Sequence, residues 1–111
     1  MSIAIDKSGP VPVFQPEGQI NSANAASFEA DLMTQLDKGE QKIVLDLSRL
    51  NYISSAGLRV LLLLAKKMKQ SGGALVLFGA QPNVKEIFEI SGFLAVLKVC
   101  DTREQAFAAL P

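Results

Sequence analysis

The feature that most constrains the fold is a regular alternation of short apolar runs with segments that carry one apolar helical face. The apolar runs lie at 42–47, 74–78 and 95–100, and the helical segments at 55–70 and 82–91 separate them. Short continuous apolar runs are typical of strands that are covered on both faces of a parallel sheet. Because strands and helices alternate, the sequence predicts an α/β fold with right-handed crossovers.

The N-terminal third adds an edge to this sheet. We expect short strands at 3–5 and 11–14, paired across a turn, and a break in the chain at Gly18. A first helix is expected from Ser22 to Lys38, since Gly39 stands where a helix of this spacing stops.

The C-terminal end closes the pattern with a short helix after Asp101, where Thr102 and Gln105 have the spacing of a capping box. With no linker or repeat in the chain, residues 1–111 are predicted to form a single domain. The predicted architecture is a mostly parallel five-stranded sheet with about four helices and an antiparallel N-terminal edge strand.

Composition removes several classes of function. The chain has no histidine and a single cysteine, Cys100. Ser-His-Asp and Cys-His catalytic arrangements are therefore excluded, as are zinc sites built on histidine. The loop from Glu17 to Ser22 has no glycine-rich cradle for a phosphate. We expect no enzymatic activity, no metal and no cofactor.

Charge and hydropathy limit the kinds of partner and the cellular compartment that we expect for this protein. Lys plus Arg and Asp plus Glu number 11 each, so no basic stripe favours a nucleic-acid partner. The longest strongly apolar run, Val60 to Ala65, is too short to span a bilayer, and the N-terminus lacks a signal-peptide pattern. A single cysteine fits a reducing compartment. We expect a cytoplasmic monomer that does not insert into membranes.

Two adjacent serines, Ser54 and Ser55, lie where a polar turn meets the helix expected at 55–70. A serine at this corner can accept a hydrogen bond from backbone N–H groups, so helix capping is its simplest interpretation. Its hydroxyl would also be accessible, and Gly57, which has no Cβ, would let another backbone approach closely. A phosphate there would add about −1.5 to −2 charges at the positive end of a helix, which the fold should tolerate.

The same segment resembles the STAS domain, which sulfate transporters share with bacterial anti-sigma-factor antagonists. In the antagonists the pattern is similar to Asp-(Leu/Phe)-Ser-x-(Leu/Val)-x-(Tyr/Phe)-(Ile/Met)-(Asp/Ser)-Ser-(Ser/Thr/Ala)-Gly-(Leu/Ile). The residues of this chain that fill those places are Asp46, Leu47, Ser48, Leu50, Tyr52, Ile53, Ser54, Ser55, Ala56, Gly57 and Leu58. A weaker match over 73–93 and the order of elements extend the resemblance over essentially the whole chain.

The resemblance implies an anti-sigma-factor antagonist that acts as a phosphorylation-controlled partner switch. Ser55 would be the phosphoacceptor of a serine protein kinase that is itself the anti-sigma factor or its close relative, and a serine phosphatase would restore it. The unmodified form would bind the kinase and release that protein's other client. The implied partner-binding residues are Asn21, Ser54, Ser55, Ala56, Gly57, Leu58 and Arg59, with Asp46 and Ser48 in support.

Three positions depart from the family pattern. Ser54 stands where Asp is common, which makes it a rival phosphoacceptor. Arg59 stands where Gly is common, and it could pair with an acidic partner, pair with the phosphate or remain solvated. Asn21 replaces an Asp and loses its charge, and it could instead cap the first helix or form a turn before it.

Two other functions stay open at this point. A STAS domain can be a scaffold subunit of a transporter or signalling complex that is never phosphorylated. An enzyme or small-molecule-binding domain is the third hypothesis, and the absence of histidine and of a phosphate-binding loop disfavours it.

Overall fold

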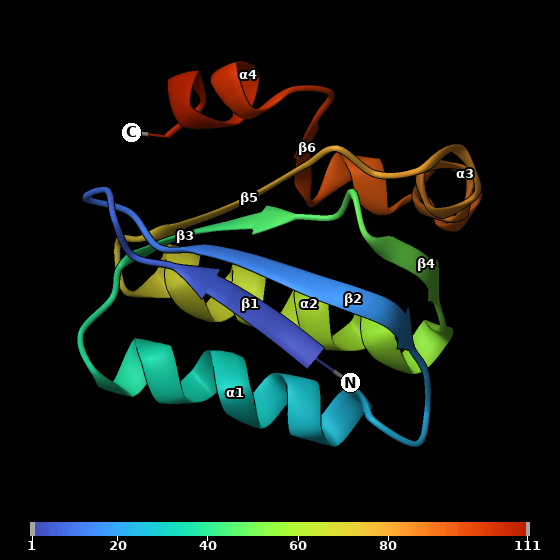
Figure 1. Cartoon of the computed structure of the whole chain (residues 1–111), viewed down its shortest axis with the longest axis horizontal. Helices are drawn as coiled ribbons and strands as arrows, with labels where there is room; N and C mark the ends of the chain where they lie inside the picture. Colours follow the sequence, from blue (N-terminus) through green and yellow to red (C-terminus); the bar gives the residue numbers. More distant parts are fainter. Residues whose placement is uncertain (1, 111) are drawn as a thin grey trace.

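A single mixed sheet with helices on both faces organises the protein, as a computed structural model that describes residues 2–110 shows (Figure 1). The strands are β1 (Ser2–Asp6), β2 (Val13–Ile20), β3 (Lys42–Asp46), β4 (Leu50–Ile53), β5 (Ala74–Phe78) and β6 (Lys98–Cys100). The helices are α1 (Ala25–Asp37), α2 (Ser55–Gln70), α3 (Pro82–Ser91) and α4 (Arg103–Ala108), with a 3-10 turn at Phe93–Ala95. The predicted α/β class is confirmed.

The sheet has the order β1-β2-β3-β5-β6, and β4 pairs with β2 beside this path. β1 and β2 are antiparallel, with Ser2 opposite Glu17 and Asp6 opposite Val13. The pairs β2–β3, β2–β4, β3–β5 and β5–β6 are all parallel. The mostly parallel sheet and the antiparallel N-terminal edge are therefore as predicted.

The strand count differs from the prediction, because residues 2–110 form six strands and not five. The additional strand, β4, lies in the segment that the sequence indicated as loop. It pairs with the second half of β2, which continues to Ile20 and does not break at Gly18. Gly18 has a φ of +87°, and the register shifts after it. Glycine takes this left-handed conformation readily, so the position bends β2 with a bulge and does not end it.

The last strand is shorter than its apolar pattern indicated. Gly92 ends α3 with a φ of +77°, and the next residues turn once more before β6 begins at Lys98. The backbone N–H of Leu97 donates to the carbonyl oxygen of Phe93 at 2.8 Å, which holds this turn closed. The stretch from Ala95 to Leu97, predicted as strand, is therefore used by the turn.

The helices cover the sheet unequally. In Figure 1, α1 and α2 lie along one face, and α4 lies on the opposite face. Neighbouring residues of β3 point to opposite faces, so Leu45 joins the larger cluster and Val44 the smaller one under α4. The larger cluster also holds Phe14, Phe28, Leu61 and Phe88, all with 0–1% of their surface exposed. Among the described residues, no helix combines the length and apolarity that crossing a bilayer requires.

Candidate functional site

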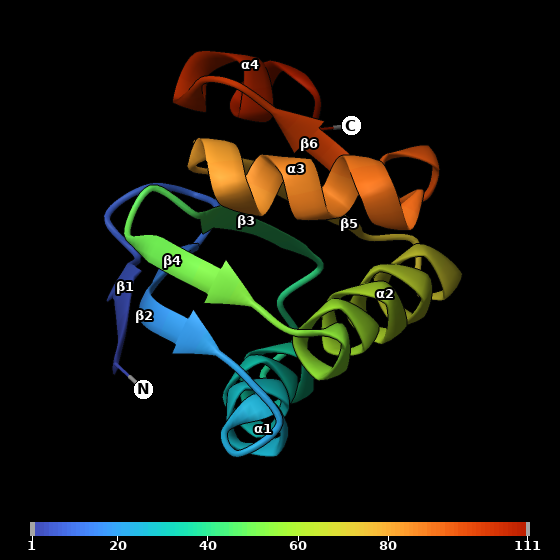
Figure 2. The same cartoon turned by 90° about the vertical axis from the view of Figure 1, so that its right-hand side faces the viewer.

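The pairing of β2 with β4 creates the candidate site at the carboxyl end of both strands. Ile20 lies opposite Ile53, so the residues that follow them, Asn21 and Ser54, leave the sheet side by side. The backbone N–H of Ser54 donates to the carbonyl oxygen of Ile20 at 2.8 Å and ties the two exits together. Figure 2 shows the chain passing from β2 toward α1 and from β4 toward α2 at this edge.

Ser54 caps α2. Its backbone is extended, with φ −84° and ψ 172°, and its Oγ accepts a hydrogen bond from the Gly57 N–H at 3.2 Å. The N–H of Leu58 donates to the Ser54 carbonyl oxygen at 2.9 Å. Ser54 is half-buried, and its hydroxyl already satisfies one of the N–H groups that a helix leaves unpaired at its start.

Ser55 differs from its neighbour in every one of these respects. It is the first residue of α2, it is exposed, and within residues 2–110 its hydroxyl has no hydrogen-bond partner. The N–H groups of Ser55 and Ala56 have no partner inside the helix, so the hydroxyl stands at the positive end of the helix dipole. The geometry thus separates a capping serine from a free one.

Gly57 and Leu58 have packing roles. A Cβ at Gly57 would lie 2.7 Å from Ile20 Cγ2 and 2.7 Å from Ile53 Cγ1, so only glycine lets the first turn of α2 rest on the strand ends. Leu58 is 6% exposed and belongs to the larger core cluster, and Ala56 packs against that cluster. Leu58 is buried and Ala56 is half-buried, so both help to hold Ser55 in place. The contact of Ala56, Gly57 and Leu58 with a partner, which the family resemblance implies, stays a prediction.

Asn21 forms a turn before α1. Its Oδ1 accepts from the N–H groups of Ala23 at 2.9 Å and Asn24 at 3.2 Å. Asn24 Oδ1 accepts in return from the Asn21 N–H at 2.8 Å. This reciprocal pair explains why α1 begins at Ala25 and not at Ser22. The turn interpretation of Asn21 therefore holds, and sequence reasoning missed Asn24, although the Asn-x-x-Asn spacing resembles a capping box.

Asp46 and Ser48 support the segment between β3 and β4. Asp46 Oδ2 accepts from Gln15 Nε2 at 2.8 Å, and Asp46 Oδ1 accepts from the Ser48 N–H at 3.0 Å. The Ser48 carbonyl oxygen accepts from Gln81 Nε2 at 3.0 Å. The start of α3 also binds the next strand, because the Asn83 amide donates to the carbonyl oxygen of Asn51. These amide contacts join segments more than thirty positions apart in the chain, so the sequence carried no local sign of them.

Arg59 lies one helical turn after Ser55. It is exposed, and no residue between 2 and 110 forms an ion pair with it. The other charged residues of α2 are Lys66, Lys67 and Lys69, so this helix carries only positive charge. The accessible part of the site is therefore a free hydroxyl followed by a free guanidinium.

The family model of the STAS domain matches residues 2–106. The chain belongs to the STAS-domain family. This match covers every strand and the helices α1 to α3, the first part of α4, and the β4–α2 corner that carries Ser54 and Ser55.

Named relatives of this STAS domain are regulators. A Bordetella bronchiseptica protein named as a candidate anti-sigma factor antagonist, BtrV, is 52% identical over 109 residues, which cover 98% of this chain and 94% of that protein. The crystal structure of a candidate anti-sigma factor antagonist from Thermotoga maritima superposes with a TM-score of 0.90 at 26% identity, over 97% of this chain and 93% of that one.

The fold is also that of the anti-sigma factor antagonist SpoIIAA, at 18% identity. Its unphosphorylated form matches with a TM-score of 0.78 over 96% of this chain and 93% of that one. The phosphorylated form from Bacillus matches with a TM-score of 0.71 over 96% and 97%.

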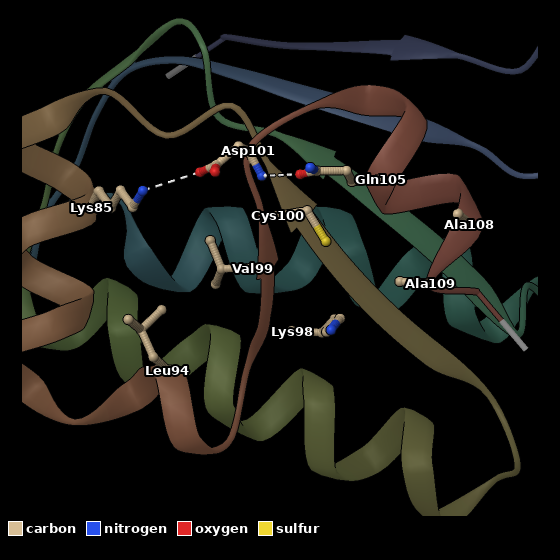
Figure 3. Close-up of a pocket in the computed structure, with 9 residues that line it drawn as sticks. All are labelled: Lys85, Leu94, Lys98, Val99, Cys100, Asp101, Gln105, Ala108 and Ala109. Carbon is tan, nitrogen blue, oxygen red and sulfur yellow. Dashed lines mark hydrogen bonds and ion pairs between the residues drawn. The ribbon is translucent and has the colours of Figure 1, made fainter.

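A hollow of about 560 Å³ lies elsewhere on this STAS domain, beside β6 and between α3 and α4 (Figure 3). Its polar groups bond to one another: Lys85 Nζ lies 3.0 Å from Asp101 Oδ1, and Gln105 Oε1 accepts from the Asp101 N–H at 3.0 Å. The Asp101 carboxylate raises the pKa of Lys85. No predicted site residue lines this hollow, and residues 2–110 contain no cluster of metal-binding side chains.

Proposed function

We propose that this STAS domain is an anti-sigma-factor antagonist whose binding to an anti-sigma factor with serine kinase activity is controlled by phosphorylation of Ser55. The observation that carries the proposal is the free, exposed hydroxyl of Ser55 directly after the serine that caps α2. Ser54 is the poorer acceptor, because modifying its Oγ would remove the hydrogen bond from Gly57. The names of the relatives support the antagonist role.

The modification is a simple phosphoryl transfer. The Ser55 oxygen forms a bond to the γ-phosphorus of ATP while the bond from that phosphorus to the β–γ bridging oxygen breaks. ADP leaves, and the hydroxyl proton passes to a base of the kinase or to water. A serine phosphatase reverses the state by hydrolysis. Because ATP is the phosphoryl donor, we place this cycle in the cytoplasm.

The phosphate acts as a switch through charge and not through refolding. It adds about −1.5 to −2 charges at an exposed position, so no core contact has to change. A partner surface that docks on a neutral hydroxyl must instead desolvate a dianion, which weakens the complex. A difference of a few kcal/mol corresponds to roughly a hundredfold change in affinity, which is enough to exchange one partner for another.

The acceptor assignment is tested by mapping the modified residue. The purified chain is incubated with ATP and its cognate serine kinase, and the phosphopeptide is sequenced by mass spectrometry. We expect phosphate on Ser55 in the unaltered chain and in Ser54→Ala, and none in Ser55→Ala. Phosphate on Ser54, or an unmodified chain beside a labelled control substrate, would refute the assignment.

The switch itself is tested by affinity. Ser55→Asp should bind the kinase at least roughly tenfold more weakly than the unaltered chain, while its circular dichroism spectrum stays the same. Ser55→Ala, which removes the hydroxyl without adding charge, is the matched control and should retain most of the affinity. Equal affinities for all three chains would support an unphosphorylated scaffold instead.

A further inference from the structure

Ser55 and Arg59 occupy neighbouring turns on the same exposed face of α2. Side chains four residues apart on a helix have Cβ atoms roughly 5–6 Å from each other. Helical side chains lean toward the N-terminus, so Arg59 extends back over the turn that begins with Ser55. A negative group placed four positions before a positive one is also the more favourable order for an ion pair. The guanidinium is therefore within reach of a phosphate on the serine.

The surroundings leave Arg59 available for that role. Its own helix has no acidic residue that could compete for it. Four other elements lie around α2, and β5 has no titratable or charged side chain. Such side chains on the other three are Glu29, Asp31 and Asp37 on α1, Tyr52 on β4, and Lys85, Glu86 and Glu89 on α3. None of them pairs with Arg59, and Glu29 lines a groove with Lys66 and Lys67 farther along α2.

We propose that Arg59 is the intramolecular counter-ion of phosphorylated Ser55. The proposal rests on the function proposed above. It adds that the Arg59 guanidinium changes its binding partner when Ser55 is phosphorylated. In the unmodified chain the guanidinium, with five N–H donors, is free to bind a carboxylate of the partner. In the modified chain it binds the phosphate through charge-assisted hydrogen bonds. Phosphorylation thus adds negative charge and withdraws a cation from the same surface.

The counter-ion is detected through the second pKa of the phosphate. Phosphoserine is installed at position 55 during synthesis of the full chain, and the ³¹P resonance is titrated with pH. Because a nearby cation favours the dianion, the phosphate should have a pKa lower by about 0.5 in the unaltered chain than in Arg59→Gln. The matched control is Lys66→Gln, which removes a cation from the same helix face about 16 Å from Ser55 along the axis, beyond the screening length.

The pKa values of the phosphate in the three chains either support or overturn the counter-ion proposal. A lower phosphate pKa that is lost in Arg59→Gln and kept in Lys66→Gln supports the counter-ion. Equal pKa values in the unaltered chain and Arg59→Gln overturn it. Since phosphoserine is installed without a kinase, a kinase that modifies another residue would refute the proposed function and leave this measurement valid.

The contribution of Arg59 to partner binding is measured on the unmodified chain. Calorimetric titration with the kinase should show about five-fold weaker binding for Arg59→Gln than for Lys66→Gln, because only Arg59 adjoins Ser55. Both variants should keep the unaltered melting temperature, since both side chains are exposed. Equal affinities for the two variants would overturn the claim that Arg59 contacts the partner.

Discussion

At the scale of single residues, two adjacent serines have different environments for a local reason. Ser54 has an extended backbone, which directs its oxygen toward the first turn of α2, whereas Ser55 already has a helical backbone and directs its side chain outward. The buried glycine at position 57 brings this turn down onto Ile20 and Ile53. Ser54 therefore stabilises the corner, whereas the hydroxyl of Ser55 is exposed and forms no hydrogen bond within residues 2–110.

The stability of single variants tests this division. Ser54→Ala removes the cap of α2 and should lower the free energy of unfolding by about 0.5–2 kcal/mol in urea denaturation. Ser55→Ala removes an unbonded, exposed hydroxyl and should change it by about 0.5 kcal/mol or less. Comparable losses in the two variants would mean that both hydroxyls serve the helix terminus.

At the scale of elements, α2 links the core to the site. Leu61 is 0% exposed and Leu64 is 2% exposed, whereas Leu63 is 50% exposed and lies between them on the outer face. The buried face fixes the helix against the sheet, and the outer face presents Ser55 and Arg59. The helix can therefore present a modified residue without any change in its packing.

Two leucines of this helix provide a matched comparison. Leu61→Ala leaves a cavity in the larger core cluster and should reduce the free energy of unfolding by about 2–5 kcal/mol. Leu63→Ala deletes the same atoms from a half-exposed position and should cost about 1 kcal/mol or less. Chemical denaturation of both variants measures the difference, and similar losses would contradict the described orientation of α2.

At the scale of the whole molecule, the two faces of the sheet are unequally protected. The larger cluster lies beneath α1 and α2, while in the smaller one Val13, Val44, Val76 and Phe78 of the sheet pack against Ala106 of α4. The six-residue α4 begins with a capping box, in which Thr102 Oγ1 accepts from the Gln105 N–H at 3.2 Å and Gln105 Oε1 accepts from the Thr102 N–H at 3.3 Å. So short a helix depends on that cap and on Ala106 for its stability.

Hydrogen exchange should show α4 opening separately from the rest. Thr102→Ala should raise the exchange rate of the Ala106 and Ala109 amides roughly five-fold, the equivalent of about 1 kcal/mol of lost capping. Amides of α2 should keep their rates. Thr34→Ala, on the exposed face of α1, is the control and should leave α4 unchanged. Equal acceleration in α2 and α4 would show that the domain opens only as one unit.

Prediction from the sequence succeeded where short-range contacts decide the structure. The bounds of α2, the stop of α3 at Gly92 and the capping box of α4 were all predicted, because each depends on residues within one or two turns. It failed for β4 and for Gly18 within β2, since a four-residue strand with two exposed positions is defined by its pairing and not by its own pattern.

For the site, the sequence by itself determined the α/β class, the helix that begins at Ser55 and the pair of serines at its start, because spacing and capping are local properties of the chain. The tertiary structure alone decided which hydroxyl is free, why position 57 must be glycine and why Asn21 lies beside Ser54. Those answers depend on the pairing of β2 with β4, which joins segments about thirty residues apart. Such a contact forms only when the whole sheet assembles, and no local pattern in the chain encodes it.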